Sequence, residues 1–455
     1  MANYLERTFG SGGNLKKWTV SFWMKPAVSQ TNNQHIFSVT GDSGNDQGLA
    51  PRYRLGSSGT IEFSQADNGW ISDLEPRAQL RDPAAWYHIV LVWDSNNGTS
   101  GDRCIVYING VRQTSFGSED YPSQNIDSMT NKSGWKHGIG SNVHNDGWSG
   151  TRNPFNGQLS QFYFSDGYAY AASDFGQTDS TTGEWKPKSF SGSYGTTGFY
   201  LKFETTASNG LGTDSSGNAN HWTVVNGDVR QQSIDTPSNN FPVLNSIGTI
   251  GRTNQGQTDL NNGSNNDYCN TTTRTRTSGQ GESGGACTAT FGLPQRGKWY
   301  YEWKIIGGGT NAAWFGLEST YATSTYNIIY YGNNGNKYVD GSGSSYGASY
   351  GQNDVIGVAV DVDNNQVTFY KNNSSQGVIT ASNLQNHIKS HGMFPFFSDG
   401  GGNGPLVAVN FGNPSPDFSL ASAQADANGY GNFEYAPPTG FYALCTQNIS
   451  QYGGA

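Results

Sequence analysis

Charge is scarce in this sequence, which contains neither a block of positive charge nor a long apolar run. Asp, Glu, Lys and Arg make up 13% of the 455 residues, and the formal net charge is −9. A nucleic-acid partner would require a positive stripe against its phosphates, so we expect none. The longest apolar stretches, residues 89–93 and 355–360, are far shorter than the roughly 20 residues of a membrane-spanning helix, so we expect no membrane insertion. The opening residues 1–7 lack the apolar core of a classical secretion signal.

Cysteine is scarce as well, and the four cysteines show no CxxC spacing. Cys104 and Cys445 lie in apolar, strand-like stretches, where we expect buried free thiols. Cys269 and Cys287 could form a disulfide only if neighbouring strands brought them together. The lack of a secretion signal favours the reduced form of this pair.

Glycine and aromatic residues are abundant: the chain has 62 glycines, and 13% of its residues are aromatic. The aromatic content argues against disorder, and the composition is not that of a helical protein. Trp18–Met24 places large apolar residues at every second position, and Asn109–Gly110 is a hairpin signal after a strand-like run. The sequence therefore predicts an all-β protein made of two antiparallel sandwiches in tandem. The best helix candidate is Ser419–Asn428.

A stretch rich in proline and asparagine divides the chain. We predict a first sandwich over 1–230, an extended connector over 231–266, a second sandwich over 267–445 and a C-terminal tail over 446–455. Proline stiffens the connector. Its apolar residues could anchor it to a neighbouring surface; they are Phe241, Val243 and Leu244.

Residues 1–230 resemble a laminin-G/pentraxin type of concanavalin-like sandwich (jelly-roll type). The resemblance rests on four segments: WTVSFWMKP (18–26), AWYHIVLVWD (85–94), IVYING (105–110) and GQLSQFYF (157–164). In most members, a segment resembling 199–225 precedes the WTVSFWMKP-like strand, whereas here it comes last. The resemblance thus implies a circularly permuted domain, which sandwiches tolerate because their chain ends lie close together.

Residues 267–445 resemble a SPRY domain, another concanavalin-like sandwich. This resemblance also rests on four segments: GKWYYEWKI (297–305), WFGL (314–317), DVIGVAVDVDNNQVTFYK (354–371) and VNFG (409–412). SPRY domains recognise partners through loops at one end of the sandwich, and residues 321–350 are similar to that region.

Three further phrases resemble those of tailed-phage virion proteins, particularly of marine, cyanophage-like phages. They are DSSGNANHW (214–222), DTPSNNFPVLN (235–245) and APPTGFYALCT (436–446). This resemblance implies a location on the virion surface after assembly in the host cytoplasm, with other virion proteins as partners. It also implies a homo-oligomer, with a trimer favoured.

The acidic residues offer no clear catalytic pair. A glycosidase needs two carboxylates across the sugar, and the E-x-D-x-x-E and E-x-D-x-E patterns of concanavalin-like hydrolases are absent. Asp361 and Asp363 share a face, but they bracket a turn, where Asp stabilises the reversal of the chain. Glu302 has an apolar context that could raise its pKa, but it lacks a partner, and an outward position on the strand accounts for it. We therefore expect no enzymatic activity and no catalytic residues.

Metal sites are equally poorly supported. His387 and His391 lie four residues apart without a nearby carboxylate or cysteine, so we predict no zinc site. Related sandwiches often hold a structural Ca²⁺ ion in rim loops, where this chain has Asp42, Asp46, Asp146 and Asp214. Aspartates in loops also serve as turn residues, so the calcium ion and its ligands stay open. No other cofactor is expected.

The candidate ligand-binding residues are aromatic side chains in loop-like segments, because exposed rings stack on sugars. They are Trp135, Trp148, Tyr321, Tyr326, Tyr330, Tyr331, Tyr346 and Tyr350. The alternative is that these rings line a sandwich rim or pack between subunits.

Three functions follow from these observations. The first is a non-enzymatic virion surface protein, such as a tail fibre, spike or capsid-attached appendage, that adheres to host glycans or envelope components. The second is a purely structural decoration or adaptor protein of the virion. The third, a polysaccharide depolymerase, is disfavoured by the missing carboxylate pair.

Overall fold

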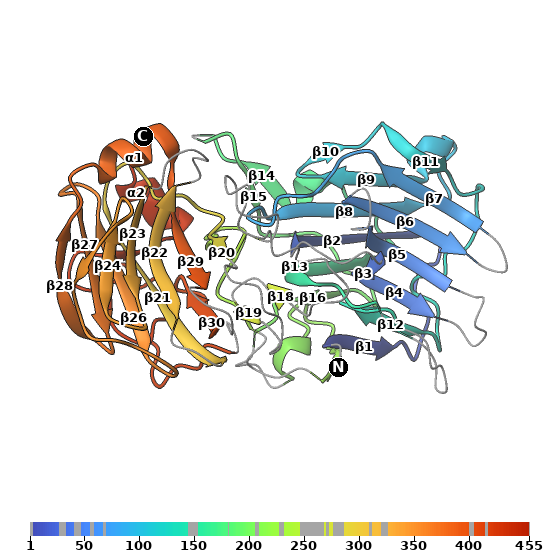
Figure 1. The fold of residues 1–455 in the computed structure, drawn as a ribbon. Coiled ribbons are helices and arrows are strands. Elements are labelled where there is room, and N and C mark those ends of the chain that lie inside the picture. Colours follow the sequence, from blue (N-terminus) through green and yellow to red (C-terminus); the bar gives the residue numbers. More distant parts are fainter. Residues whose placement is uncertain are drawn as a thin grey trace. The chain divides into compact units, whose positions relative to one another are not determined.

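The computed structural model divides into two compact units, Met1–Gln232 (unit 1) and Ser233–Ala455 (unit 2), and each is described by itself. It describes residues 3–26, 33–40, 47–54, 59–66, 70–143, 153–180, 182–204, 209–226, 232–245, 268–269, 273–275, 286–308, 312–319, 326–399, 405–414 and 417–454. Both units are β-sandwiches with antiparallel sheets (Figure 1), which confirms the predicted fold class.

Unit 1 packs a nine-stranded sheet against a six-stranded sheet. The nine-stranded sheet has the order β11-β7-β6-β5-β4-β12-β1-β17, with β3 beside β5. Its strands are β1 (Tyr4–Thr8), β3 (Asn33–His35), β4 (Phe37–Thr40), β5 (Gln47–Arg54), β6 (Thr60–Ala66), β7 (Trp70–Pro76), β11 (Phe116–Asp120), β12 (Lys136–Ile139) and β17 (Thr223–Val225). The six-stranded sheet has the order β10-β9-β8-β2-β13-β16. Its strands are β2 (Lys17–Pro26), β8 (Tyr87–Asp94), β9 (Cys104–Ile108), β10 (Val111–Arg112), β13 (Gly157–Asp166) and β16 (Phe199–Leu201).

The core of unit 1 follows the predicted alternation. Trp18, Val20 and Phe22 of β2 are fully buried between the sheets, and Trp18 stacks on Trp93 of β8 with ring centroids 6.0 Å apart. The segment expected to be permuted adds an edge strand to each sheet, because β16 pairs with β13 and β17 pairs with β1.

An extra layer covers the outer face of the six-stranded sheet in unit 1. We call it the unit 1 cover (residues 168–180 and 182–194), and it includes the hairpin of β14 (Gly176–Thr178) and β15 (Trp185–Pro187). Phe175 of this layer is buried against the outward side chains Val90, Val92 and Tyr163. Short 3₁₀ turns complete the unit at Ser100–Asp102, Ala172–Asp174 and Gly210–Gly212.

Unit 2 packs an eight-stranded sheet against a six-stranded sheet. The first has the order β18-β19-β30-β21-β26-β27-β28, with β31 parallel to β21. Its strands are β18 (Tyr268–Cys269), β19 (Thr273–Thr275), β21 (Lys298–Gly308), β26 (Val355–Asp361), β27 (Gln366–Lys371), β28 (Ser374–Thr380), β30 (Pro405–Asn410) and β31 (Tyr442–Ala443). The second has the order β20-β29-β22-β23-β24-β25. Its strands are β20 (Ala286–Thr288), β22 (Ala313–Ser319), β23 (Asn327–Tyr331), β24 (Asn336–Val339), β25 (Ser342–Ser345) and β29 (Met393–Asp399).

The helices of unit 2 are short and lie elsewhere than predicted. They are α1 (Leu384–His391) and α2 (Thr446–Tyr452). The helix expected at Ser419–Asn428 is wrong, because this segment forms turns and a bridge between Gln424 and Phe433. No helix among the described residues has both the length and the apolar character to span a membrane.

A second extra layer covers the outer face of the eight-stranded sheet. We call it the unit 2 cover, and it combines residues 233–245 with residues 417–452. Phe241 is buried against Tyr300 and Ala359, which point outward from β21 and β26. Phe418 packs in the same way on Val355 and Ala408. Part of the expected connector and most of the expected tail thus belong to unit 2.

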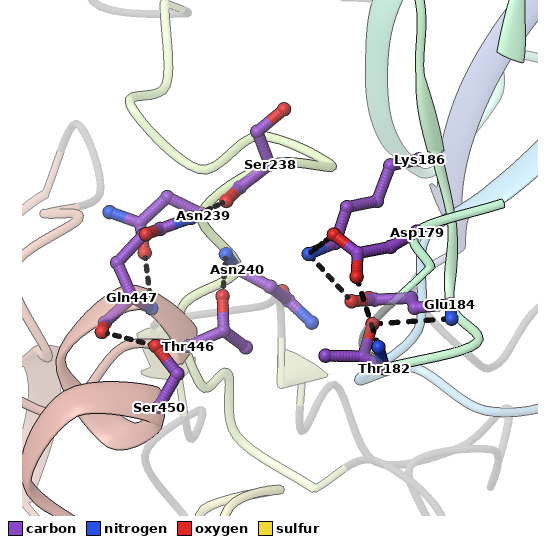
Figure 2. A network of polar contacts seen from close by, with 10 residues as sticks. All are labelled: Asp179, Thr182, Glu184, Lys186, Ser238, Asn239, Asn240, Thr446, Gln447 and Ser450. Carbon is purple, nitrogen blue, oxygen red and sulfur yellow. Dashed lines mark hydrogen bonds and ion pairs between the residues drawn. The ribbon is translucent and has the colours of Figure 1, made fainter. Parts of the chain in front are cut away.

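The two parts of the unit 2 cover are joined by polar contacts (Figure 2). The backbone N–H of Asn240 donates to Thr446 Oγ1 at 2.9 Å, and the Thr446 N–H donates to Asn240 O at 3.0 Å. The Gln447 side chain donates to Ser238 O at 2.6 Å. Two of the phage-like phrases, 235–245 and 436–446, therefore pack on each other.

Candidate functional site

The tyrosines predicted to form one recognition face are placed in several different environments. Tyr330 and Tyr350 are core residues, with 0% and 2% of their surface exposed, so their expected place in exposed loops is wrong. Tyr330 lies on β23, where its ring points between the sheets and lies 4.8 Å from that of Tyr350. The Tyr350 hydroxyl is within hydrogen-bond distance of the carbonyl oxygen of Ala313. Neither ring can stack on an external ligand.

Two other tyrosines of the set are partly buried and have internal contacts. Tyr326 stacks on His387 and His391 of α1, with ring centroids 4.1 and 5.0 Å apart. Tyr346 accepts a hydrogen bond from the Phe369 N–H and donates one to Gly377 O, which joins it to β27 and β28. These contacts give both residues structural roles.

The remaining predicted residues are distributed between the two units. Trp135 is 9% exposed and packs against Val39 and Met129, with Lys132 Nζ 4.1 Å from the centroid of its ring. Tyr331 is half-buried on the outer face of the six-stranded sheet. Trp148 and Tyr321 lie outside the described residues.

Glu302 is buried, and the expected outward position does not expose it to solvent. The side chain does point outward from β21, but the unit 2 cover lies over it and leaves it 0% exposed. Four donors reach its carboxylate: the N–H groups of Glu434 and Tyr435 at 2.9 Å, Asn410 Nδ2 at 3.1 Å and the Tyr300 hydroxyl at 3.2 Å. Burial raises the pKa of Glu302 to about 7, while the four donors favour the charged form and oppose the rise. The carboxylate ties β21 to its cover.

Asp361 and Asp363 stabilise a turn, as predicted. Asp361 forms a 2.8 Å ion pair with Lys298 and accepts hydrogen bonds from the N–H and side chain of Asn364. Partial burial works to raise its pKa, but these contacts hold the pKa of Asp361 below its ordinary value. Asp363 accepts from the N–H of Gly297. Both carboxylates therefore have structural partners, Asn364 in the β26–β27 turn and Gly297 and Lys298 at the start of β21.

Of the four aspartates considered for calcium, only Asp214 is among the described residues. Its carboxylate accepts hydrogen bonds from the N–H groups of Tyr200, Ser216 and Asn220 and from the Ser216 hydroxyl. Asp42, Asp46 and Asp146 lie outside the described residues. Within the described ranges, no three His, Cys, Asp or Glu side chains are grouped as a metal-ion site would require. Cys104 and Cys445 are buried free thiols, as predicted, and Cys287 is buried as well.

Three rings lie together on the outer face of the six-stranded sheet in unit 2, and only Tyr331 among them was predicted from the sequence. We call this group the aromatic face, formed by Trp314 of β22, Tyr331 of β23 and Tyr338 of β24. The Trp314 ring stacks on Tyr338 with centroids 4.6 Å apart and meets Tyr331 at 5.1 Å. Ile329 and Phe396 lie buried beneath it. The available signal was the alternation in β22, which turns Ala313 and Phe315 inward and Trp314 outward.

Family models match one domain in each unit. Residues 8–173 match the concanavalin A-like lectin/glucanases superfamily, in its laminin-G model, and residues 298–414 match the SPRY domain. The chain is a tandem of a concanavalin-like domain and a SPRY domain. The concanavalin-like match ends inside the unit 1 cover, and the SPRY match excludes both parts of the unit 2 cover.

Individual relatives of the two domains are distant. The ATP-dependent RNA helicase Ddx1 of Drosophila melanogaster is 27% identical over 161 residues, which cover 35% of this chain and 19% of the helicase. The chain therefore spans about a fifth of that relative's length. Among solved structures, the human HERC1 SPRY domain is 18% identical, covers 30% of this chain and 87% of its own, and has a TM-score of 0.26. The heptameric SAP-like pentraxin of Limulus polyphemus is 20% identical, covers 37% and 72%, and has a TM-score of 0.27. These likenesses concern the fold alone.

Proposed function

We propose that the chain is a non-enzymatic binding protein of a tailed-phage virion surface, as part of a tail fibre, spike or capsid-attached appendage. It adheres to host glycans or envelope components. The concanavalin-like superfamily includes both lectins and glucanases, so the choice between binding and hydrolysis depends on the carboxylates of this chain.

The observation that carries the proposal is the use of the candidate carboxylates inside the fold. Glu302 accepts four hydrogen bonds beneath the unit 2 cover, and Asp361 and Asp363 are held in a turn. A catalytic pair must reach the sugar from opposite sides. These three carboxylates serve the turn or the cover and are not placed for that task, which supports binding over hydrolysis.

The virion location is supported by the three phage-like phrases of the sequence. Two of them build the unit 2 cover, and the third contains Asp214 with its four internal hydrogen bonds. The resemblance therefore concerns segments that support the fold. The sheet faces and loops outside these segments can differ between relatives. A homo-oligomer, with a trimer favoured, belongs to the same proposal and is tested by light scattering on the purified chain.

The experiment incubates the purified chain with surface polysaccharide of a candidate host and measures two quantities, retention on the polysaccharide and release of reducing ends. We expect retention without release. Release of reducing ends would instead establish a depolymerase. Parallel samples with Ca²⁺ and with EDTA test the structural calcium ion, because a required ion makes retention or thermal stability fall in EDTA.

A purely architectural role is the second candidate, and the burial of Tyr330 and Tyr350 favours it. These rings stabilise the SPRY sandwich and contribute nothing to an exposed recognition face. A structure of the assembled particle separates the two functions. Adhesion requires the outer faces of unit 2 to be exposed on the particle, whereas a decoration or adaptor protein would have them against other virion proteins.

A further inference from the structure

We infer that Asn209 of unit 1 is a self-modification site, where the side-chain amide is converted to aspartate or isoaspartate without an enzyme. The backbone nitrogen of Gly210 attacks Cγ of Asn209 and forms a C–N bond. The Cγ–Nδ2 bond breaks, and ammonia leaves with the N–H proton of Gly210. Water then opens the five-membered imide at either carbonyl group, which yields aspartate or isoaspartate. This inference is independent of the proposed adhesive function.

The reaction favours an asparagine followed by glycine, because glycine has no Cβ to crowd the attacking nitrogen. In six such pairs both residues lie within the described ranges. The pairs begin at Asn97, Asn109, Asn156, Asn209, Asn334 and Asn428. The dipeptide is the same in all six, so the structure around each pair decides which asparagine reacts first.

At Asn209 both reacting groups are without hydrogen bonds. Its side chain is exposed and makes no bond to the 3₁₀ turn Gly210–Gly212 that follows it. Among the described residues, none accepts a hydrogen bond from the Gly210 N–H or bonds to the Asn209 amide. The space beside Gly210 is also open, since a Cβ placed there would meet no atom within 4 Å. The amide and the nitrogen that attacks it are therefore both available.

Attack requires rotation of the Asn209 backbone, because its ψ of 19° holds the Gly210 nitrogen away from Cγ. This rotation gives up the hydrogen bond from the Asn209 N–H to Thr213 Oγ1, which is 3.2 Å long and exposed. The following turn can stay in place, anchored where Gly212 O accepts from the Trp222 N–H at 2.8 Å. A single exposed hydrogen bond contributes little net free energy, so the rotation is accessible.

In two other pairs the attacking nitrogen is engaged. The Gly335 N–H donates to Tyr331 O at 3.0 Å, and the Gly429 N–H donates to Asp426 O at 3.0 Å. Each nitrogen must give up this bond before it can attack. The barrier to imide formation is therefore higher at Asn334 and Asn428 than at Asn209.

The three remaining pairs are held through the asparagine side chain or through a strand. The Asn109 side chain accepts from the His88 N–H at 2.8 Å, and the Asn97 side chain accepts from the Thr99 N–H at 2.9 Å. Gly157 belongs to β13, which pairs with β2. Rotation at these asparagines breaks contacts that hold a turn or a sheet, so they too should react more slowly.

Conversion of Asn209 makes the formal net charge one unit more negative than −9. The isoaspartate form also lengthens the backbone by a methylene group. Because Asn209 is exposed and precedes the anchored residues of its segment, unit 1 is expected to stay folded. The protein thus acquires a more acidic form as it ages.

The test incubates the full chain at mildly alkaline pH and follows each asparagine by peptide mapping with mass spectrometry. Fragment spectra separate Asn209 from Asn226, which lies on the same tryptic peptide. We expect Asn209 to convert about tenfold faster than Asn334 or Asn428, a difference of about 1.4 kcal/mol in the barrier. Asn209→Ser should remove the signal at this position and leave the conversion of Asn334 unchanged.

The same incubation in urea, which unfolds the chain, is the control for local sequence. Faster conversion of Asn209 than of the other five in the folded chain, with similar rates for all six in urea, supports the inference. Equal rates in the folded chain would show that the structure does not select this pair. An intact Asn209 after Asn334 or Asn428 has converted, or the same order of rates in urea as in the folded chain, would also overturn it. Retention on polysaccharide tests the proposed function separately.

Discussion

Units 1 and 2 solve the same packing problem in different ways. In each, one sheet has apolar side chains on both faces, so its outer face needs a further layer. Unit 1 covers it with a continuous stretch that begins two residues after β13, around Phe175 and Trp185. Unit 2 uses two stretches separated by more than 150 residues, 233–245 and 417–452, which meet at Asn240 and Thr446. The unit 1 cover is thus one stretch close in sequence to the sheet that it covers. The unit 2 cover is complete only when both of its stretches are in place.

The buried ionisable group beneath each layer differs as well. In unit 1, the Trp185 indole N–H donates to His88 Nδ1 at 3.0 Å, so Nε2 carries the proton shared with Ser21 Oγ at 2.9 Å. Burial lowers the pKa of His88 to about 3. In unit 2 the corresponding group is Glu302, whose pKa burial raises to about 7. Because one group is an imidazole with a lowered pKa and the other a carboxyl group with a raised pKa, the stabilities of the two units are expected to change with pH in opposite directions.

The largest effect is expected from removing the apolar anchor of either layer. Phe241→Ala should lower the free energy of unfolding of unit 2 by about 3–5 kcal/mol, and Phe175→Ala should do the same to unit 1, because both rings are 1% exposed. Urea unfolding followed by tryptophan fluorescence, with limited proteolysis to assign each transition, measures both changes. Ile234→Ala, at a 37% exposed position, is the control. If Phe241→Ala shifted both transitions equally, the covers would not belong to separate units.

The second prediction concerns pH. Because the pKa of Glu302 is raised from its unfolded value, its contribution to stability is present below about pH 4.5 and is lost as pH rises through about 7, by up to about 3 kcal/mol. His88 has a lowered pKa, so its contribution is present above about pH 6.5 and is lost as pH falls towards 3. Unit 2 should therefore weaken between pH 4.5 and 7, where unit 1 should strengthen. Urea unfolding at a series of pH values measures both trends.

Variants test whether Glu302 and His88 cause these pH dependences. Glu302→Gln should abolish the pH dependence of the free energy of unfolding of unit 2. His88→Gln should reduce the pH dependence of unit 1, where buried His137 adds a similar dependence. Asp417→Asn, at an exposed position in unit 2, should leave the slope of unit 2 unchanged. An unaltered slope in Glu302→Gln would mean that the carboxylate stays charged throughout this range.

The smallest effect is expected where the two stretches of the unit 2 cover meet. Thr446→Val keeps the shape of the side chain but removes the acceptor of the Asn240 N–H, and should cost unit 2 about 1 kcal/mol. Ser450→Ala, in the same helix and exposed, should cost close to nothing (Figure 2). Thermal unfolding of unit 2 distinguishes the two. Equal stability of both variants would show that apolar packing alone joins the stretches.

Local patterns in the sequence predicted most of the fold. The alternation of Trp18–Met24 predicts a strand with one face in the core, and this is confirmed. Asn109 and Gly110 adopt φ values of 47° and 81°, which only such residues accept readily, and they join β9 to β10 as predicted. These outcomes depend on residues close in sequence, where side-chain period and backbone preference decide the structure.

The candidate site was harder to predict because it depends on contacts distant in sequence. The glycines and asparagines around Tyr330 and Tyr350 suggested loops, although Asn327–Tyr331 is a strand with Tyr330 in the core. The burial of Glu302 could not be predicted, because the part of the cover that donates to it lies more than 130 residues further along the chain. Trp314 and Tyr338 share a face only through the register of β23 between them, which no spacing in the sequence reveals.

The two-stretch closure of unit 2 also sets an order of events during synthesis. Unit 1 can fold as soon as residue 232 has left the ribosome, since its sheets and its cover are then complete. The sandwich of unit 2 can begin to pack later, but Phe241 stays without its full surroundings until Ala443 and Cys445 have been made. A nascent chain that stalls before that point would expose the apolar outer face of the eight-stranded sheet, a surface that chaperones and proteases recognise. Exposure of this face therefore distinguishes an incomplete chain from one in which Ala443 and Cys445 have been made.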